Sequence, residues 1–317
     1  MTLEPSPRPA LSVIIAVYRC RRTLVELHAR LSAVLPTCVP SYEIIFVDDC
    51  CPENSWVEIE RLVSNDPHVR GIKLSRNFGQ AIAISAGLKE CDGDRAVVMD
   101  GDLQDPPEAI PILLEAAASG AVLVYAKRKS DHQSFARLQF GRLYFQFLKL
   151  ISGRAVDPGY GTFTLLSREV IDAYTQFTEP RRHYLFILYW LGYDGIDIEY
   201  KRDRRTVGTS SYPFWKLLKH SYAGLIFYSE SLLRVVIFAT LAMVLVGLSM
   251  PFGSGMVKDV QFALFSILLA AVLSILGILA SNTLEYSKHR PLFTVLKRIG
   301  RRSGPTLTFQ SDQSSAV

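Results

Sequence analysis

Residues 95–108 read RAVVMDGDLQDPPE. An apolar run followed at once by acidic residues predicts a buried strand over 95–99 that ends in a polar loop. In extended backbone, residues i and i+2 point to the same side, so we expect Asp100 and Asp102 to converge. Gly101 between them allows a ligand to approach the backbone closely.

Carboxylate and amide oxygens in this arrangement suit a hard divalent cation. Asp100 and Asp102 would be joined by Gln104 in binding Mg²⁺ or Mn²⁺, which could bridge a diphosphate and stabilise it as a leaving group. Asp105 is expected to cap a helix that begins at Pro106. The alternative is a solvated acidic turn, since a D-x-D triplet is common by chance. The strand before the triplet and the cap after it favour the metal site.

Strands alternate with helices around this stretch, which indicates an α/β domain with a mainly parallel, twisted sheet and helices on both faces. We expect further strands over 11–17, 43–47, 69–74 and 121–125, and helices over 23–35, 56–63, 78–88 and 106–118. Ligands of such sheets bind beyond the carboxyl ends of the strands. The polar residues expected at that edge are Tyr18, Asp48, Asp49, Arg76, Asn77, Asp100 and Asp102. Neither G-x-G-x-x-G nor G-x-x-x-x-G-K occurs, so no dinucleotide fingerprint or P-loop is indicated.

Composition narrows the class of protein. The chain has 317 residues, a length typical of about two domains, with 49% hydrophobic and 21% charged residues, which argues against disorder. A net charge of +5 is too mild to indicate a nucleic-acid partner. Five cysteines without a C-x-x-C pair argue against a disulfide framework or a structural zinc site. Cys50 and Cys51 are interpreted as reduced thiols in a cytosolic setting.

Two long uncharged runs, 235–257 and 260–284, follow the α/β domain. Each is long enough for a helix to cross a hydrocarbon layer of about 30 Å. Lys258 and Asp259 lie between them, in a segment that we expect to be a tight turn. The alternative, a buried helical hairpin in a soluble core, is disfavoured because core helices seldom run this long without a charge. We therefore predict a two-helix transmembrane hairpin over 234–285.

Flanking charges predict the orientation of this hairpin. Arg234 precedes the first run, the connecting loop holds only Lys258, and six basic residues follow the second run, namely Lys288, Arg290, Lys297, Arg298, Arg301 and Arg302. The positive-inside rule places the α/β domain and both termini in the cytoplasm. Residues 1–10 are polar and proline-rich, which predicts an N-terminal tail without a signal peptide. Residues 286–317 are expected to form a basic cytoplasmic tail with a disordered end.

Two further segments have the composition of a membrane surface. Residues 213–233 combine aromatic and basic side chains directly before the first run, which favours an interfacial helix. Residues 135–154 are compatible with a basic amphipathic helix or with an ordinary core helix. The basic residues within 201–205 could hold an anionic headgroup, or form a solvated charge run.

The run LSRNFGQ at 74–80, followed by the acidic stretch through Glu108, resembles family 2 glycosyltransferases. Within that family it is similar to the polyprenyl- and dolichyl-phosphate glycosyltransferases. The resemblance covers about residues 10–300 and includes the order of the elements. It implies a GT-A catalytic domain over 11–212, a Rossmann-like nucleotide-sugar domain, in a multi-pass protein of the bacterial inner membrane. Homo-oligomers occur among similar enzymes.

The resemblance also implies roles for particular residues. Asp100, Asp102 and Gln104 would bind the metal. The nucleotide site would be lined by Ala16, Tyr18, Asp48, Asp49, Arg76, Asn77 and Asp100. Residues 205–212, RTVGTSSY, match the family loop R-x-x-G-x-S-K-Y at all but one fixed position. Arg202, Arg205 and Ser210 would then hold the acceptor phosphate, and Asp102 and Arg205 would be the catalytic residues.

Several positions depart from the family pattern. The segment P-x-Y-N-E becomes AVYRC at 16–20, D-D-G-S becomes DDCC at 48–51, and the loop lysine becomes Ser211. The segment T-G-D-F-R becomes YGTFT at 160–164, which removes the family's candidate catalytic carboxylate, although Asp157 is close by in sequence. A lipid monophosphate has a second pKa of about 6, so it is largely ionised at neutral pH and needs positioning more than proton removal.

These patterns lead to one main hypothesis. The protein is expected to be an inverting, metal-dependent transferase that moves a sugar from a UDP- or GDP-sugar to undecaprenyl phosphate, for modification of cell-envelope glycans or lipopolysaccharide. The alternative is a catalytically degenerate homologue that binds nucleotide or lipid and docks onto a membrane partner. A processive polysaccharide synthase is disfavoured, because two spans are few for threading a polymer and no Q-x-x-R-W motif occurs.

Overall fold

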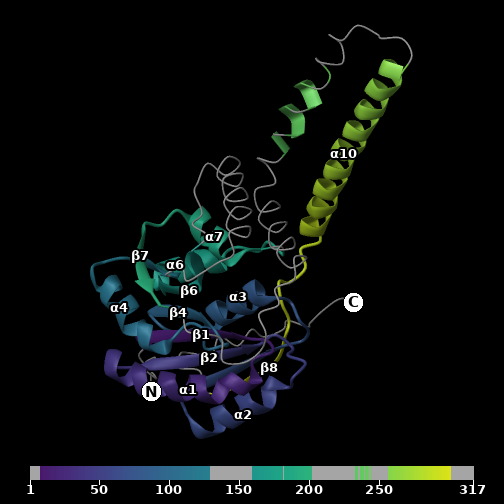
Figure 1. Cartoon of the computed structure of the whole chain (residues 1–317). Coiled ribbons are helices and arrows are strands. Elements are labelled where there is room, and N and C mark those ends of the chain that lie inside the picture. The colour runs from purple at the N-terminus through teal and green to yellow at the C-terminus, as the bar shows by residue number, and fades with distance from the viewer. Residues whose placement is uncertain are drawn as a thin grey trace, which may run out of the picture.

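A single mixed sheet organises the part of the chain that the computed structural model describes. The described residues are 8–128, 159–180, 182–201, 233–234, 236–238, 240–242, 244 and 256–300. Within them the sheet has eight strands in the order β7-β5-β6-β4-β1-β2-β3-β8 (Figure 1). The strands are β1 (Leu11–Val17), β2 (Tyr42–Asp48), β3 (Val69–Leu74), β4 (Arg95–Asp100), β5 (Leu123–Arg128), β6 (Tyr160–Ser167), β7 (Gly195–Tyr200) and β8 (Val295–Ile299).

The sheet is mainly parallel, as predicted. Strands β1, β2, β3 and β4 pair in parallel, and β5 pairs in parallel with β7. Strand β6 lies antiparallel between β4 and β5, and β8 lies antiparallel at the edge beside β3. The helices between them are α1 (Leu24–Cys38), α2 (Ser55–Asn65), α3 (Gln80–Glu90), α4 (Ile110–Ala118), α6 (Arg168–Thr175) and α7 (Tyr184–Leu191). Short 3₁₀ turns, Arg21–Thr23 and Pro107–Ala109, precede α1 and α4.

Helices cover both faces of the sheet. Helices α1, α2 and α4 pack on one face, and α3, α6 and α7 on the other (Figure 1). Strand β1 alternates between these two layers: Val13 and Ile15 face the first, and Ile14 faces the second. Because β1 is buried on both sides, its continuous apolar run agrees with the prediction for a central strand.

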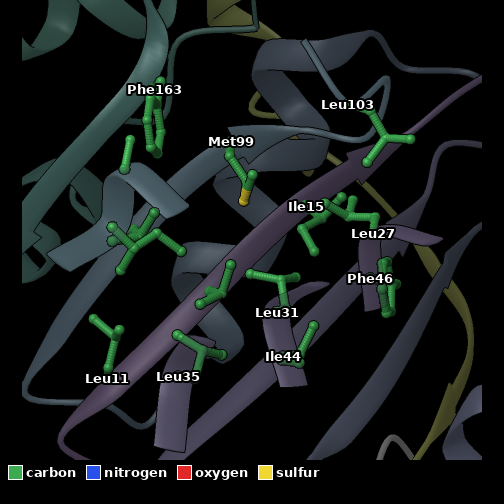
Figure 2. Packing of buried hydrophobic residues seen from close by; sticks show 14 of the residues in the cluster. Leu11, Ile15, Leu27, Leu31, Leu35, Ile44, Phe46, Met99, Leu103 and Phe163 are labelled. Carbon is green, nitrogen blue, oxygen red and sulfur yellow. The ribbon is translucent and has the colours of Figure 1, made fainter. Parts of the chain in front are cut away.

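The spacing of leucines on α1 explains its position. Leu27, Leu31 and Leu35 recur at i, i+4 and i+8, so they form one stripe along the helix. The stripe lies against Ile15 and Ile44 of the sheet (Figure 2), and the three leucines are fully buried. Burying a leucine contributes about 1.5–3 kcal/mol relative to exposure, so these side chains hold α1 beneath β1.

Asp105 does not cap a helix, contrary to the prediction. Pro106 is extended, a 3₁₀ turn follows, and α4 begins only at Ile110. The Asp105 side chain is fully buried and accepts a hydrogen bond from the Tyr200 hydroxyl at 2.5 Å. It therefore ties the loop after β4 to the end of β7. The strand expected over 121–125 also shifts, to Leu123–Arg128.

The second apolar run forms one long helix, α10 (Met256–Ser287). It begins earlier than predicted, so Lys258 and Asp259 belong to its first turn and not to a connecting loop. Among the described residues, α10 is the one helix long and apolar enough to cross a membrane, over Phe265–Ser287. Its surface is strongly apolar, and Phe262 is 73% exposed. The first predicted span, 235–257, lies largely outside the described residues, and the hairpin is not confirmed.

Residues 295–299 form a strand, whereas a basic tail was expected from residue 286. Strand β8 pairs with β3, with Gly71 opposite Ile299. Lys297 Nζ lies 2.6 Å from a Glu60 oxygen, and Arg298 Nη2 lies 2.8 Å from a Glu90 oxygen. These two cations therefore belong to the edge of the α/β domain. The sequence of this segment is short and contains two adjacent cations, so it resembles a solvated tail. Short strands with charged side chains are nevertheless typical of sheet edges, which is where β8 lies.

We predict that replacing Ile299 by alanine destabilises the protein by about 1–2 kcal/mol, because this partly buried side chain packs on the core beside Gly71. The matched control is Leu296→Ala, since Leu296 is 65% exposed on the same strand and should change stability by less than about 0.5 kcal/mol. Unfolding in detergent, followed by circular dichroism, measures both. Equal effects would mean that β8 does not dock on the sheet.

Candidate active site

The carboxyl ends of the parallel strands bring the predicted polar residues to one edge of the sheet. Ala16 on β1 lies opposite Asp100 on β4, and Val17 lies opposite Asp48 on β2. The loops after these strands carry Tyr18 and Asp102. The predicted polar residues therefore gather at this edge, but β4 ends at Asp100 and the next two residues form a turn, so the extended backbone expected over 100–102 is not present. The roles of the individual side chains follow from their surroundings.

Asp49 joins two loops of this edge. It is 2% exposed and accepts hydrogen bonds from the backbone N–H groups of Phe78, at 2.7 Å, and Gly79, at 2.8 Å. Burial raises the pKa of Asp49, and the two N–H donors oppose that rise. The carboxylate thus holds the loop after β2 against the loop that leads into α3.

Asp48 is also buried and turned toward the backbone. Its Oδ1 atom accepts a hydrogen bond from the Cys51 N–H at 2.9 Å, and burial raises the pKa of Asp48. The Cys51 sulfur in turn accepts from the Arg19 N–H at 3.1 Å and from the Ser55 hydroxyl at 3.0 Å. The two cysteines in place of the family's G-S pair are therefore compatible with an ordered loop.

The other predicted nucleotide-site residues lie at the surface of this edge. Tyr18 is 44% exposed, with the Arg19 guanidinium 5.5 Å from its ring centroid. Arg76 is exposed and lies 4.4 Å from the Phe78 ring centroid. Asn77 is exposed, and its side-chain amide donates to the Asp49 carbonyl at 3.4 Å. These side chains can reach a ligand bound beyond the strand ends.

Packing against Cys20 favours glycine at position 101. A Cβ atom at this position would lie 2.9 Å from the Cys20 sulfur, closer than side chains ordinarily approach. Cys20 stands where the family pattern has an acid, and it is 8% exposed. Burial raises the pKa of its thiol to about 12, so the group stays protonated at neutral pH.

A buried leucine sets the shape of the acidic turn. Leu103 is 1% exposed, packs into the core cluster (Figure 2) and has a left-handed backbone with φ of 61°. This conformation costs roughly 1–2 kcal/mol outside glycine, and burial of the side chain offsets it. The Asp102 carboxylate accepts from the Gln104 N–H at 3.2 Å across the turn.

Asp100 receives two hydrogen bonds that sequence reasoning missed. Its Oδ1 atom accepts from the Gln80 side-chain amide at 2.6 Å and from the Thr162 hydroxyl at 2.8 Å. Gln80 begins α3 and Thr162 lies on β6, so three separate elements meet at this carboxylate. The departure at Thr162 was visible in the sequence, but the antiparallel placement of β6 beside β4 was not.

The donor set fits a divalent cation that is shared with a substrate. Among the described residues, no group of three or more acidic, histidine or cysteine side chains forms a closed metal cage. Mg²⁺ is commonly held by one or two carboxylates together with substrate phosphates. Asp100 and Asp102, with Gln104 beside them, match that requirement. Arg202, Arg205, Ser210 and Asp157 lie outside the described residues, as do 135–154 and 213–232, so their roles stay predictions.

We predict that Asp49→Asn destabilises the protein by about 1–3 kcal/mol, because an amide offers one oxygen where two N–H donors need acceptors. Thermal unfolding in detergent measures the change. Asp94→Asn removes the same charge at an exposed position and serves as the matched control. A loss no larger than that of the control would contradict the linking role of Asp49.

Sequence comparison places the chain among known transferases. The model of the family described as Glycosyl transferase family 2 matches residues 12–175. The uncharacterized glycosyltransferase YkcC of Bacillus subtilis is 31% identical over 305 residues, which cover 91% of this chain and 94% of that protein. Undecaprenyl-phosphate 4-deoxy-4-formamido-L-arabinose transferase of Proteus mirabilis is 29% identical, over 92% of this chain and 94% of that protein. Bactoprenol glucosyl transferase of Shigella phage SfV is 31% identical, over 80% of this chain and 87% of that protein.

Solved structures show the same fold. Glucosyl-3-phosphoglycerate synthase from Mycobacterium tuberculosis, in complex with Mn²⁺, UDP and phosphoglyceric acid, aligns with a TM-score of 0.50 over 71% of this chain and 78% of that one. Because the two sequences are only 18% identical, this likeness shows the fold alone. The architecture is the Rossmann-like GT-A fold with a mostly parallel sheet. With its acidic turn at the carboxyl edge of that sheet, the chain is a glycosyltransferase and belongs to glycosyl transferase family 2.

Proposed function

We propose that the protein transfers a sugar from a UDP- or GDP-sugar to polyprenyl phosphate, with inversion, at the cytoplasmic face of the bacterial inner membrane. The product would serve modification of cell-envelope glycans or lipopolysaccharide. The observation that carries the proposal is the pair Asp100 and Asp102, which lie at the carboxyl edge of a nucleotide-sugar fold. Relatives named as undecaprenyl-phosphate and bactoprenol transferases, alignable over most of the chain, support the lipid acceptor.

Asp100, Asp102 and Gln104 would hold Mg²⁺ or Mn²⁺ against the donor diphosphate. When bound, the ion supplies positive charge to the leaving diphosphate. Tyr18, Arg76 and Asn77 are exposed at the same edge and are available to the nucleotide. Ala16 lies opposite Asp100 at the same edge. Asp48 and Asp49 would contribute by holding the loops that carry these residues.

The acceptor needs no carboxylate base in this scheme. A lipid monophosphate is largely ionised at neutral pH, so its oxygen is already a nucleophile. Arg202, Arg205 and Ser210 would hold that phosphate in line with the sugar, and Arg205 would offset the charge that develops on the diphosphate. Thr162 stands where the family pattern has an acid. The reaction would not need that acid as a base, because the acceptor phosphate has already lost its proton.

The path of the chain between β7 and β8 supports a membrane hairpin. Strand β7 ends at Tyr200 and β8 begins at Val295, and both belong to one sheet. A chain that crosses the bilayer along α10 and returns to the sheet on its starting side must cross once more between Tyr200 and Met256. The predicted span over 235–257 would supply that crossing. The catalytic domain and the C-terminal end of α10 then share the cytoplasmic side, as the basic flanks favour.

We predict that Asp102→Asn lowers transfer at least about 100-fold, because the metal loses a charged ligand that stabilises the leaving group. Purified protein in detergent is given UDP- and GDP-sugars, undecaprenyl phosphate and Mg²⁺ or Mn²⁺, and labelled lipid product is counted. Asp94→Asn is the control and should keep normal activity. Unchanged transfer by Asp102→Asn would contradict the proposed role of Asp102 as a metal ligand. Nucleotide binding without any product would favour the degenerate binding protein.

We predict that a cysteine at position 258 reacts from outside the cell, because Lys258 lies between the two proposed spans, 235–257 and 265–287. The variant Lys258→Cys is treated with a membrane-impermeant maleimide in right-side-out and inverted vesicles. The native Cys50, exposed on the catalytic domain, is the internal control and should react only in inverted vesicles. Reaction of both thiols from the same side would contradict the hairpin.

A further inference from the structure

The carboxylate of Asp100 is oriented by two neutral donors, and we propose that one of them, Thr162, is a positioning residue for metal binding. The inference rests on the metal site of the proposed function. The Thr162 hydroxyl and the Gln80 amide donate to the same Asp100 oxygen, at 2.8 and 2.6 Å. Two donors from different elements fix both the direction of the carboxylate and the rotation of its plane.

Strand register explains why position 162 reaches Asp100. In the antiparallel pair of β4 and β6, Val98 lies opposite Thr164. Continuing that register by two residues in each strand puts Asp100 opposite Thr162. Side chains of directly opposite residues in an antiparallel pair lie about 4.5–5.5 Å apart at Cβ, which is a distance that one hydroxyl can bridge. Position 162 is therefore the place on β6 from which a short side chain can hold this carboxylate.

The chemistry of a hydroxyl suits this task and that of a carboxylate does not. An ionised acid accepts hydrogen bonds but cannot donate one, so an ionised aspartate at position 162 could not support the Asp100 carboxylate in this way. Threonine donates without adding charge. Its branched side chain also restricts the χ1 angle, which limits the positions of the hydroxyl.

The neighbouring departure from the family pattern fits the same scheme. Thr164, which stands where that pattern has an arginine, is fully buried, and its hydroxyl lies 2.6 Å from the Tyr184 hydroxyl. Thr162 and Thr164 thus place two neutral hydroxyl groups on one face of β6. The acid and the arginine of the family pattern are replaced together, so the strand loses one negative and one positive charge and its formal charge is unchanged.

Removal of the Thr162 donor is expected to weaken the binding of the metal ion and not only the stability of the fold. Outer-shell partners of metal ligands typically change affinity 10–100-fold when they are lost. We therefore expect Thr162→Val, which keeps the shape and removes the hydroxyl, to raise the dissociation constant of Mn²⁺ about 10-fold. Thr162→Ser restores the donor and should stay within about 3-fold of the unmodified protein. Gln80→Met removes the second donor at an exposed position, where folding is not at risk.

The test is Mn²⁺ titration of the full-length protein in detergent with UDP present, followed by the electron paramagnetic resonance signal of free Mn²⁺. Thr37→Val, the same change at an exposed position of α1, is the control, and thermal unfolding is recorded for every variant. Weaker Mn²⁺ binding in Thr162→Val and Gln80→Met, with rescue in Thr162→Ser, supports the inference. If Thr162→Val does not fold, Gln80→Met is compared with Thr162→Ser. Weaker Mn²⁺ binding by Gln80→Met alone supports two donors on one oxygen, and equal binding by the two variants overturns it.

The outcomes separate this inference from the proposed function. If the unmodified protein binds Mn²⁺ and Thr162→Val binds it equally well, Thr162 is not a positioning residue and the proposed transferase is untouched. If the unmodified protein binds no Mn²⁺ at all, the metal site fails and the role of Thr162 fails with it. Equal losses in Thr162→Val and Thr162→Ser would assign the effect to packing and overturn the inference.

Discussion

Burial of the central strands on both faces is the constraint on which the site depends. The central residues of β1 and β4, 13–17 and 96–99, are apolar because a polar side chain there would carry the cost of desolvation, and Asp100 comes where β4 ends. Because β1, β2 and β4 run parallel and in register, those ends meet at one edge. The polar residues of the candidate site gather there for a packing reason, before any ligand is considered. Asp49 and Asp100 then tie the loops of that edge together through short hydrogen bonds.

Local patterns were sufficient for most of this architecture. Buried strands such as 11–17 and the leucine stripe of α1 carry their own periodicity, so they were predictable from short windows of sequence. The long helix α10 was predictable from its length without charge, although its start was misplaced. The acidic turn was recognisable because it follows a strand directly. These features depend on neighbours in the chain, which is the information that a single sequence contains.

Pairings between distant segments were not predictable in the same way. The contact of Thr162 with Asp100 joins residues 62 positions apart, and that of Lys297 with Glu60 joins residues 237 positions apart. Asp105 looked like a helix cap because it precedes two prolines, and only the fold reveals Tyr200 as its partner. Antiparallel insertion of β6 and edge addition of β8 leave no periodic signal, so the residues that complete the site were not identifiable beforehand.

The last strand of the sheet links the long apolar helix α10 to the edge that carries the candidate site. From α10 the chain descends to β8 (Figure 1), and on the way the Thr294 carbonyl accepts a hydrogen bond from the Ser75 N–H at 2.9 Å. Ser75 is the residue before Arg76 and Asn77, which lie at the proposed nucleotide site. The segment that leaves α10 therefore lies directly beside the loop proposed to bind the donor. If α10 spans the bilayer as proposed, this contact would fix the distance between the bilayer and the sugar donor.

Asp100 and Asp102 are proposed to hold a divalent cation at the carboxyl edge of the sheet, and the whole catalytic scheme depends on that ion. The most direct measurement is the anomalous scattering of Mn²⁺ in crystals of the protein grown with UDP. We predict one strong anomalous peak within about 2.0–2.2 Å of carboxylate oxygens of both residues, beside the diphosphate. Bound UDP without a peak at these carboxylates, or a peak at another group of ligands, would contradict it.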